Sequence, residues 1–379
     1  MQRMQRLMLI LFLLGNLLPA LAAKQVTVEQ LEAIVSATHG MSDAKVASRI
    51  SALELTERLS ASRSSRIETG LPGAKSQQAL VALADSAEFL NLPPAEELAL
   101  APPSAATRAS LVALTIHYLS ETIPKIPNFL ATRITSSFED TPAEDETLNA
   151  PAVFYRPLHL VGVSGVKVVN RKGQEQADSE AENEKQPAAT PAGLTTSGEF
   201  GSVLISLGAD VFEGETPWKR WEADASGPVA VFYYTVPIQR SHFLVQVPEE
   251  GKPRPSAYHG EIAVDPANGA VLRVTMIADL RPGDSVSEAK MLVAYGPVEI
   301  AGMTYILAAR SVALSTIRVV QHITDHAGGF RTYLGPAQIQ LNDVHFTNYR
   351  LFRTEVHILT GDNPEGDPSG GAPTSSTPH

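Results

Sequence analysis

The sequence predicts an α+β protein in which an N-terminal helical region precedes a mainly antiparallel β-sheet. Two patterns lead to this prediction. Apolar residues recur at helical spacing as far as residue 123, whereas from residue 127 onward apolar and polar residues alternate as in half-buried strands. Short turns such as Ala225-Ser226-Gly227 and Ala301-Gly302 join the strand-like segments, which is the order expected of an antiparallel meander.

The segment from Tyr258 to Leu280 is the clearest single element, and it predicts a β-hairpin. Pro266 presets the backbone of the turn, and Asn268 and Gly269 tolerate positive φ angles. Aliphatic and β-branched residues flank the turn on both sides, as they do in paired strands.

The register of this hairpin can also be predicted. If Ile262 lies opposite Leu272, one face is apolar, and one bulge residue is left at the turn. On the other face Glu261 then meets Arg273. The apolar face holds Tyr258, Ile262, Val264, Leu272, Val274 and Met276.

Four helices are expected before residue 124. Thr27 and Gln30 form a capping box at the start of the first helix, and Gly40 ends it. The second helix is expected to start at Ser42 and reach about residue 59, the third to span 74–90, and the fourth to run from 104 to 123. We predict that the four helices pack together as one small bundle.

The strand predicted at Val229–Val236 is apolar on both faces, unlike its alternating neighbours. Such a strand is expected in the centre of a sheet, with other structure covering each side. The segment Phe200–Val211 is compatible with either a strand or a short helix.

These patterns divide the chain into a signal peptide at 1–22, a helical domain at 23–123, an antiparallel β domain at 124–360 and a disordered tail at 361–379. Residues 1–22 combine a basic start, an apolar run and the small-x-small sequence Ala20-Leu21-Ala22 that a signal peptidase recognises. The alternative is a membrane anchor, but the apolar run is shorter than the roughly 20 residues that cross a bilayer. Residues 173–198 are polar and acidic, which predicts a disordered insertion.

Composition narrows the location and the partners. The chain has no cysteine, so we expect neither disulfides nor a cysteine-linked lipid. A net charge of −11, with no basic cluster interleaved with aromatic residues, excludes nucleic acid as an expected partner. We predict a periplasmic or secreted protein that keeps no stable membrane span after signal cleavage.

Metal and cofactor sites are not predicted. His322 and His326 have the spacing of a zinc-binding helix, but no glutamate follows the first histidine, and the flanking residues indicate strand and turn. The carboxylates Glu261, Asp265 and Asp284 fit ion-pair or turn roles rather than a catalytic pair.

Ser241 and His242 are the most plausible nucleophile and base, but the sequence does not make them partners. Neighbouring residues on a strand point to opposite faces, so these two side chains cannot act on each other. A serine elbow flanked by glycines is also absent from the sequence. We predict no catalytic residue from local sequence.

Several segments carry a resemblance to known proteins: FLATRITSSFED, GEFGSVL, WKRWEADASGPVAVFYYTVP, YHGEIAVDPANGAVLRV and YGPVEIAGMTYIL. They resemble an uncharacterised family of exported bacterial proteins. More remotely, the strand succession and the G-x-I-x-V-D-P-x-x-G hairpin are similar to the curved half-barrel of the periplasmic lipoprotein carrier and the related envelope-stress sensor. The resemblance covers about residues 127–359. It implies a half-barrel that binds acyl chains or lipoproteins in an apolar concavity and performs no chemistry.

We therefore predict an exported, non-enzymatic binding or scaffold protein that binds a lipid-like or other hydrophobic ligand, or an envelope protein. The apolar faces of the sheet are covered either by the chain's own helices or by that ligand. The alternative function is an exported hydrolase assembled from distant residues, with His242 as its base. The predicted ligand-binding residues are Trp218, Trp221, Val231, Tyr233, Ile262, Val264, Leu272, Val274 and Met276.

Overall fold

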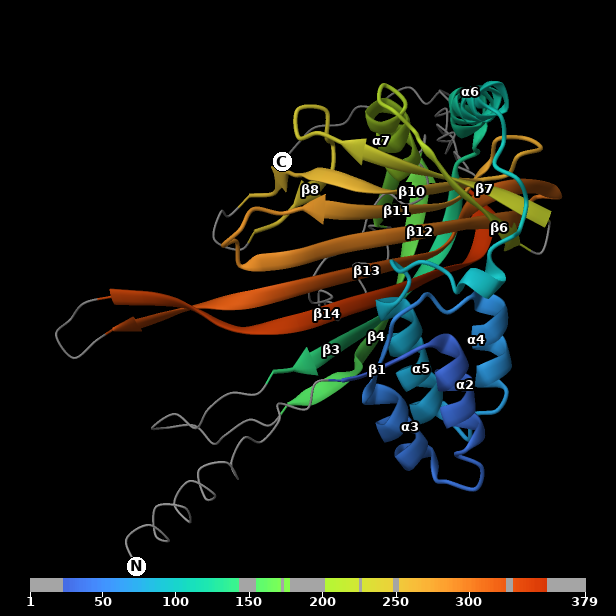
Figure 1. The fold of residues 1–379 in the computed structure, drawn as a ribbon. Coiled ribbons are helices and arrows are strands. Elements are labelled where there is room, and N and C mark those ends of the chain that lie inside the picture. Colours follow the sequence, from blue (N-terminus) through green and yellow to red (C-terminus); the bar gives the residue numbers. More distant parts are fainter. Residues whose placement is uncertain are drawn as a thin grey trace, which may run out of the picture.

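The computed structural model describes residues 23–142, 155–171, 174–177, 202–224, 227–247, 252–324 and 330–352. It confirms the predicted fold class, with helices followed by a large, open antiparallel sheet (Figure 1). The predicted signal peptide, the tail, and residues 173 and 178–198 of the predicted insertion lie outside the described residues, whereas residues 174–177 of that insertion form a strand.

The large sheet has ten strands, and each neighbouring pair is antiparallel. A separate two-stranded ribbon is formed by β8 (Leu244–Val245) and β9 (Arg254–Pro255). From one edge to the other, the order of the ten strands is β5 (Gln174–Ala177), β4 (Arg156–Arg171), β3 (Phe129–Thr141), β14 (Phe330–Leu351), β13 (Met303–Thr324), β12 (Val286–Ile300), β11 (Val271–Asp279), β10 (Ala257–Val264), β7 (Gly227–Val236) and β6 (Trp218–Asp224).

The N-terminal residues form a compact helical unit with a core of its own. Thr27 and Gln30 make both hydrogen bonds of the predicted capping box. The second helix is shorter than predicted, because the chain leaves it at Ser51 to form a strand that pairs in parallel with the first residues of the unit. The elements of the unit are β1 (Lys24–Val26), α2 (Val28–Ser36), α3 (Asp43–Ser51), β2 (Leu53–Leu55), α4 (Ala61–Glu68) and α5 (Ala74–Ser86), and its core includes Val28, Leu31, Val46, Ile50 and Leu80.

The prediction that four helices form one bundle is wrong. After η1 (Pro94–Glu96) the chain runs beside β6, where the backbone N–H of Leu98 donates to the carbonyl of Trp221 at 3.3 Å. It then enters α6 (Ala105–Thr122) and η2 (Ile123–Lys125). Leu111 and Leu119 of α6 belong to the core of the sheet, together with residues of α7 (Ser202–Val211), so α6 lies apart from the helical unit (Figure 1).

The predicted hairpin is present as β10 and β11, but its register differs from the prediction. Ile262 pairs with Val274 instead of Leu272, and the bulge lies between Ala263 and Val264. The turn has Gly269 at φ +75°, and its N–H donates to the carbonyl of Asp265 at 2.8 Å. Because of this register, Leu272 faces away from Ile262 and Val274.

Strand β7 (Gly227–Val236) is covered on both faces as predicted, but it is not central, since only β6 lies between it and the edge of the sheet. One of its faces joins the main core, which contains residues from β3 and β4 as well as from β7 and β10. Residues from both ends of the strand order therefore meet around one cluster, which requires the sheet to curve about it. We call this side the α7 face.

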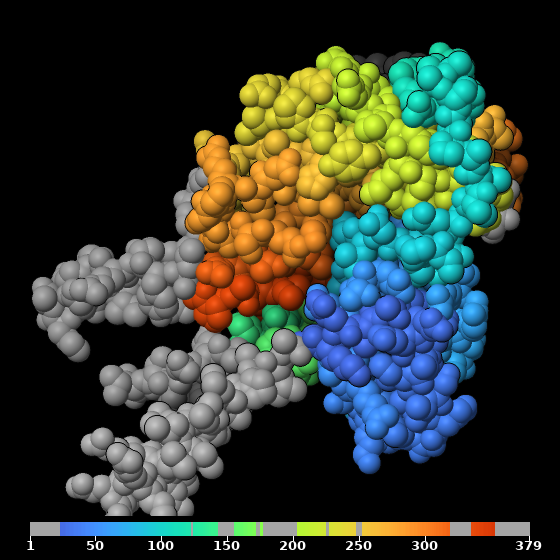
Figure 2. Space-filling view, in the orientation of Figure 1, coloured from blue at the N-terminus to red at the C-terminus, as the bar shows by residue number. Residues whose placement is uncertain are grey.

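The opposite side of the sheet, which we call the α5 face, carries the helical unit (Figure 2). Ala82 of α5 packs in one buried cluster with Phe138, Leu314 and Leu341 of the strands. Arg310 on β13 adds ion pairs to Asp85 and Glu88 at the end of α5. The sheet is therefore a middle layer, with α6 and α7 on one side and the helical unit on the other.

Candidate functional site

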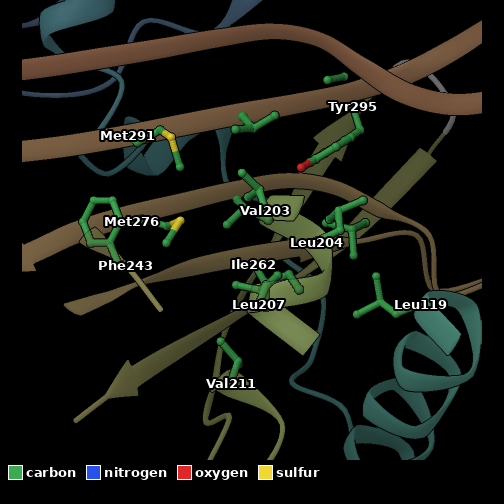
Figure 3. Packing of buried hydrophobic residues seen from close by; sticks show 14 of the residues in the cluster. Leu119, Val203, Leu204, Leu207, Val211, Phe243, Ile262, Met276, Met291 and Tyr295 are labelled. Carbon is green, nitrogen blue, oxygen red and sulfur yellow. The ribbon is translucent and has the colours of Figure 1, made fainter. Parts of the chain in front are cut away.

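The α7 face of the sheet is filled by the chain's own helices. Val203, Leu204 and Leu207 of α7 pack against the strands, and Leu119 of α6 closes one side (Figure 3). The predicted ligand residues on this face are buried in that packing, each with 4% exposure or less: Ile262, Val264, Val274 and Met276. Their surface is therefore core and not an open concavity.

The other predicted ligand residues do not join them in one site. Val231 and Leu272 lie in a small cluster on the α5 face, because alternate residues of a strand point to opposite sides. Tyr233 lines a cleft of about 510 Å³ beneath the helical unit, where the Lys219 ammonium lies 5.8 Å from its ring centre. Trp218 and Trp221 pack edge-to-face at 4.8 Å and close the end of the core beside Phe232.

The structure has an apolar groove elsewhere, between α6 and α7, with a volume of about 820 Å³. Side chains from both helices and from the chain that follows α6 form its walls. None of the described residues that line it is charged; the polar ones are Ser120 and Asn128. The lining residues are Ile116, Leu119, Ser120, Pro124, Ile126, Pro127, Asn128, Leu204, Ile205, Gly208 and Phe212.

Two isoleucines make this groove unusual for a surface. Ile116 of α6 is 43% exposed and Ile205 of α7 is 51% exposed, although deeper neighbours such as Leu204 and Leu119 are buried. Prolines at 124 and 127 end α6 and turn the chain into β3, so the groove wall continues beyond the helix. A concave apolar site with few polar groups is the usual form of a small-molecule site.

Asp210, His242 and Tyr258 form the most polar constellation near α7. Asp210 is buried at the end of α7; it accepts hydrogen bonds from the backbone N–H of His242 at 2.9 Å and from the Tyr258 hydroxyl at 2.8 Å. The Nδ1 atom of His242 lies 2.5 Å from the other Asp210 oxygen. Burial is the main reason why the pKa of Tyr258 is far above its usual value.

This constellation bears on the alternative function, since a base held by a carboxylate is one part of a hydrolase site. The Ser241 hydroxyl accepts from the backbone N–H of Phe243 at 3.1 Å. Among the described residues no hydroxyl hydrogen-bonds the His242 ring. The three contacts do fix the C-terminal end of α7 to the loop and to β10.

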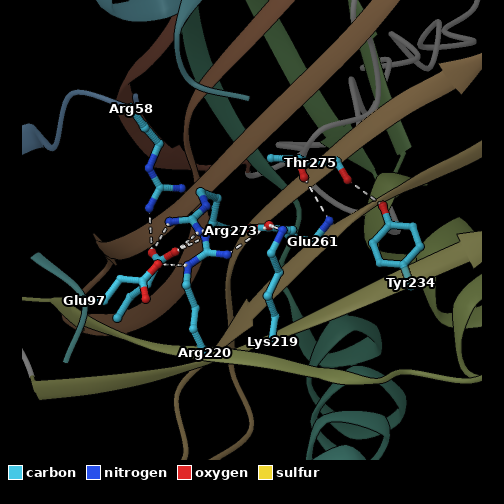
Figure 4. Close-up of polar contacts among 9 residues, drawn as sticks. Arg58, Glu97, Lys219, Arg220, Tyr234, Glu261, Arg273 and Thr275 are labelled. Carbon is cyan, nitrogen blue, oxygen red and sulfur yellow. Dashed lines mark hydrogen bonds and ion pairs between the residues drawn. The ribbon is translucent and has the colours of Figure 1, made fainter. Parts of the chain in front are cut away.

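A cluster of charges lies on the α5 face and ties the helical unit to the sheet (Figure 4). Glu222 on β6 pairs with Arg273 at 2.8 Å and with Arg58 of the helical unit at 2.7 Å, and it also pairs with Arg220. Burial alone raises the pKa of Glu222, but the surrounding guanidinium groups outweigh it, and the pKa lies far below the usual value.

The predicted pair of Glu261 and Arg273 is only a distant contact, at 3.9 Å. Glu261 pairs instead with Arg220 at 2.8 Å and with Lys219 at 2.5 Å. Burial raises the pKa of Glu261, but Arg220 and Lys219 outweigh this effect, and the pKa lies below its usual value.

No metal centre emerges from the part of the chain that the structure describes, where no group of three or more histidine or acidic side chains is placed to hold an ion. The His322 side chain and all of His326 lie outside the described residues. Among the described helices, none has the length and apolarity that a membrane crossing requires.

Comparison with known proteins gives one structural match. No family model matches the chain, and no curated protein matches it. The crystal structure of MucB in complex with MucA(peri) matches 62% of this chain and 93% of the MucB chain. The sequence identity is 13% and the TM-score is 0.20, a likeness that carries no argument about function or partners.

The groove has a signal in the sequence, although we did not predict it. Helix α6 carries two stripes of apolar or small residues: Leu111 and Leu119 are buried in the core, whereas Ala109, Ala113 and Ile116 form a second stripe. A helix that packs on one side only is normally amphipathic, with a single apolar stripe. Ile116, on the second stripe, lines the groove.

Proposed function

We propose that this chain is an exported, non-enzymatic binding protein that holds a lipid-like ligand in the groove between α6 and α7. The observation that carries this proposal is the groove itself, an uncharged site of about 820 Å³ that leaves Ile116 and Ile205 half-exposed. Each CH₂ group that such a ligand buries contributes about 0.8 kcal/mol to its affinity.

The location proposed for the ligand differs from the expected concavity. The apolar face of the hairpin is occupied by α7, so a ligand there would have to displace Leu204 and Leu207 from a packed core. In the groove a ligand covers the half-exposed Ile116 and Ile205 and displaces no core side chain of the described residues. Our proposal therefore keeps the predicted class of function and moves the site to the outer side of α7.

A titration with a fluorescent fatty acid tests this function. Ile205→Asp places a charge at the groove wall and is expected to weaken binding at least tenfold, about 1.4 kcal/mol. Ile238→Asp is the matched control, because Ile238 is 41% exposed and does not line the groove. Equal binding by both variants, or no saturable binding by the unchanged protein, would refute the proposal.

The alternative of an exported hydrolase is supported by one specific contact, the Nδ1 of His242 on the buried carboxylate of Asp210. A general base held in this way takes a proton from a hydroxyl or from water at its other ring nitrogen. The test is hydrolysis of a chromogenic ester by the purified protein. Activity that disappears in His242→Gln, with fatty-acid binding unchanged, would favour the hydrolase over the binding protein.

A further inference from the structure

The two edges of the sheet differ in how much of their backbone is covered by other parts of the chain. At the β6 edge, the preceding chain lies alongside the strand: Leu98 donates its N–H to the carbonyl of Trp221, and the Trp221 ring N–H donates to the carbonyl of Ala101 at 3.1 Å. At the other edge, β5 pairs with β4 only over Val168–Arg171. Within the described part of the chain, no strand pairs with the outer side of β4 at residues 156–167.

The backbone of this free stretch is regular in its second half. Gly162 to Lys167 pair residue for residue with β3, whereas two bulges interrupt residues 156–161, one of them at Val161. In such a strand about every second residue directs its N–H and C=O outward, where they can accept another strand. A Cβ atom at Gly162 or Gly165 would meet no atom within 4 Å, so no described residue packs over the faces of the strand at these two positions.

The side chains of the same stretch are apolar in the middle and basic toward the ends. Val161 and Val163 are 50% and 62% exposed. Arg156 and Lys167 are exposed, as is Arg171 beside β5, and none of the three has an ion pair to a described residue. Strand β4 contains no aspartate or glutamate, although the whole chain carries a net charge of −11.

Several other arginines of the sheet are neutralised. Arg133 on the adjacent strand pairs with Glu175 at 3.5 Å, and Arg310 contacts three carboxylates, whereas the exposed Arg318 and Arg350 have no ion pair to a described residue. Strand β4 is distinguished because its cations without an ion pair flank a stretch of backbone that no described strand pairs. Exposed valines on an edge strand favour the addition of another strand, and the cations determine which charge that strand should carry.

We propose that the outer edge of β4, residues 156–167, binds an extended acidic segment of a partner protein by strand addition. Main-chain hydrogen bonds supply the attachment, and the cations select the acidic sequence. A second copy of this chain is a poorer occupant, because antiparallel pairing of two such stretches over their full length brings Arg156 near Lys167 of the other copy. This surface is separate from the groove, so the proposal does not depend on the proposed ligand.

Fluorescence anisotropy with a labelled peptide of alternating threonine and glutamate, about ten residues long, tests this surface. The mature protein is expected to bind it in a saturable manner that weakens with added salt. The double variant Arg156→Glu/Lys167→Glu should bind at least tenfold more weakly. Arg281→Glu is the control, since Arg281 is an exposed cation in the turn between β11 and β12, and four strands separate β11 from β4 in the sheet.

Two further probes separate strand addition from charge attraction. The same peptide methylated on all of its backbone nitrogens has no N–H donor on either edge and cannot form the ladder of hydrogen bonds, so it should fail to bind. A peptide of alternating threonine and lysine should also fail. Binding of the methylated peptide, equal binding by the double variant, or a concentration-dependent dimer of the unchanged protein that the acidic peptide does not displace would each overturn the proposal.

Discussion

Gly260 on β10 allows the Tyr234 hydroxyl to reach between two strands of the sheet. That hydroxyl donates to the carbonyl oxygen of Thr275 on β11 at 2.6 Å, and the Thr275 hydroxyl accepts from the N–H of Glu261 at 2.9 Å. A Cβ atom at Gly260 would overlap the Thr275 carbonyl oxygen and lie 2.7 Å from its carbon and 3.0 Å from the Tyr234 hydroxyl. Backbone atoms of a central strand cannot move aside without separating the two strands.

The cost of Gly260→Ala can be estimated from its parts. Overpacking in a close-packed site costs about 1–3 kcal/mol. Leaving the buried Tyr234 hydroxyl without its acceptor adds about 1–3 kcal/mol. We therefore expect the free energy of unfolding to fall by about 2–6 kcal/mol, measured by urea unfolding followed by tryptophan fluorescence.

Matched variants isolate the cause of this loss. Gly162→Ala is the control, because it is also a strand glycine of the same sheet but has open space at its Cβ position; it should change stability by less than about 1 kcal/mol. Tyr234→Phe removes only the hydroxyl and should cost about 1–2 kcal/mol. If Gly260→Ala and Gly162→Ala have equal effects, the close approach of Tyr234 and Thr275 is not what requires glycine.

Three other predictions concern pH, α7 and the domain boundary. Folding lowers the pKa of Glu222, so its contribution to stability is present above the unfolded pKa of about 4.5 and is lost as the pH falls through the lower folded pKa. In urea unfolding, Glu222→Gln should therefore make the free energy of unfolding less dependent on pH between pH 5 and 2. At pH 7 the same variant should lower the free energy of unfolding by about 3–5 kcal/mol. An unchanged acid slope in that variant would contradict this assignment. Asp210→Asn should lower the free energy of unfolding by about 1–3 kcal/mol and increase hydrogen exchange in α7, since the carboxylate holds His242 and Tyr258; unaltered exchange would argue against that role. The predicted domain boundary at 123/124 separates α6 from the core in which it packs. A chain that starts at residue 105 should therefore show more cooperative thermal unfolding than a chain that starts at residue 124. More cooperative unfolding of the chain that starts at 124 would favour the boundary at 123/124.

Local features of the fold were predictable from the sequence. Thr27 and Gln30 lie three residues apart, so their capping box depends on no distant residue. The hairpin turn at residues 265–270 was equally clear, because Asn268 and Gly269 specify it locally. The predicted register was wrong by two residues, because Ile262 pairs with Val274, and the extra residue of the bulge is Leu272 on β11, which therefore faces away from Ile262.

Features that depend on distant contacts were not predictable in the same way. The two apolar faces of β7 indicated cover on both sides, but its place next to the edge strand depends on the order of ten strands. Asp210 and His242 are 32 residues apart, and Tyr258 lies 48 residues from Asp210, so their contact leaves no linear pattern. The groove arises because α6 crosses to the α7 face, which the helical periodicity alone does not reveal.

The central claim is that the ligand lies between α6 and α7, and photolabelling tests that location most directly. A fatty acid carrying a diazirine near its methyl end is bound to the protein, irradiated and mapped by mass spectrometry of peptides. Our account predicts labels on α6 and α7, at peptides containing Ile116 and Ile205, which an excess of unlabelled fatty acid suppresses. Competed labelling on β10 and β11 instead, or labelling that excess fatty acid does not suppress, would contradict it.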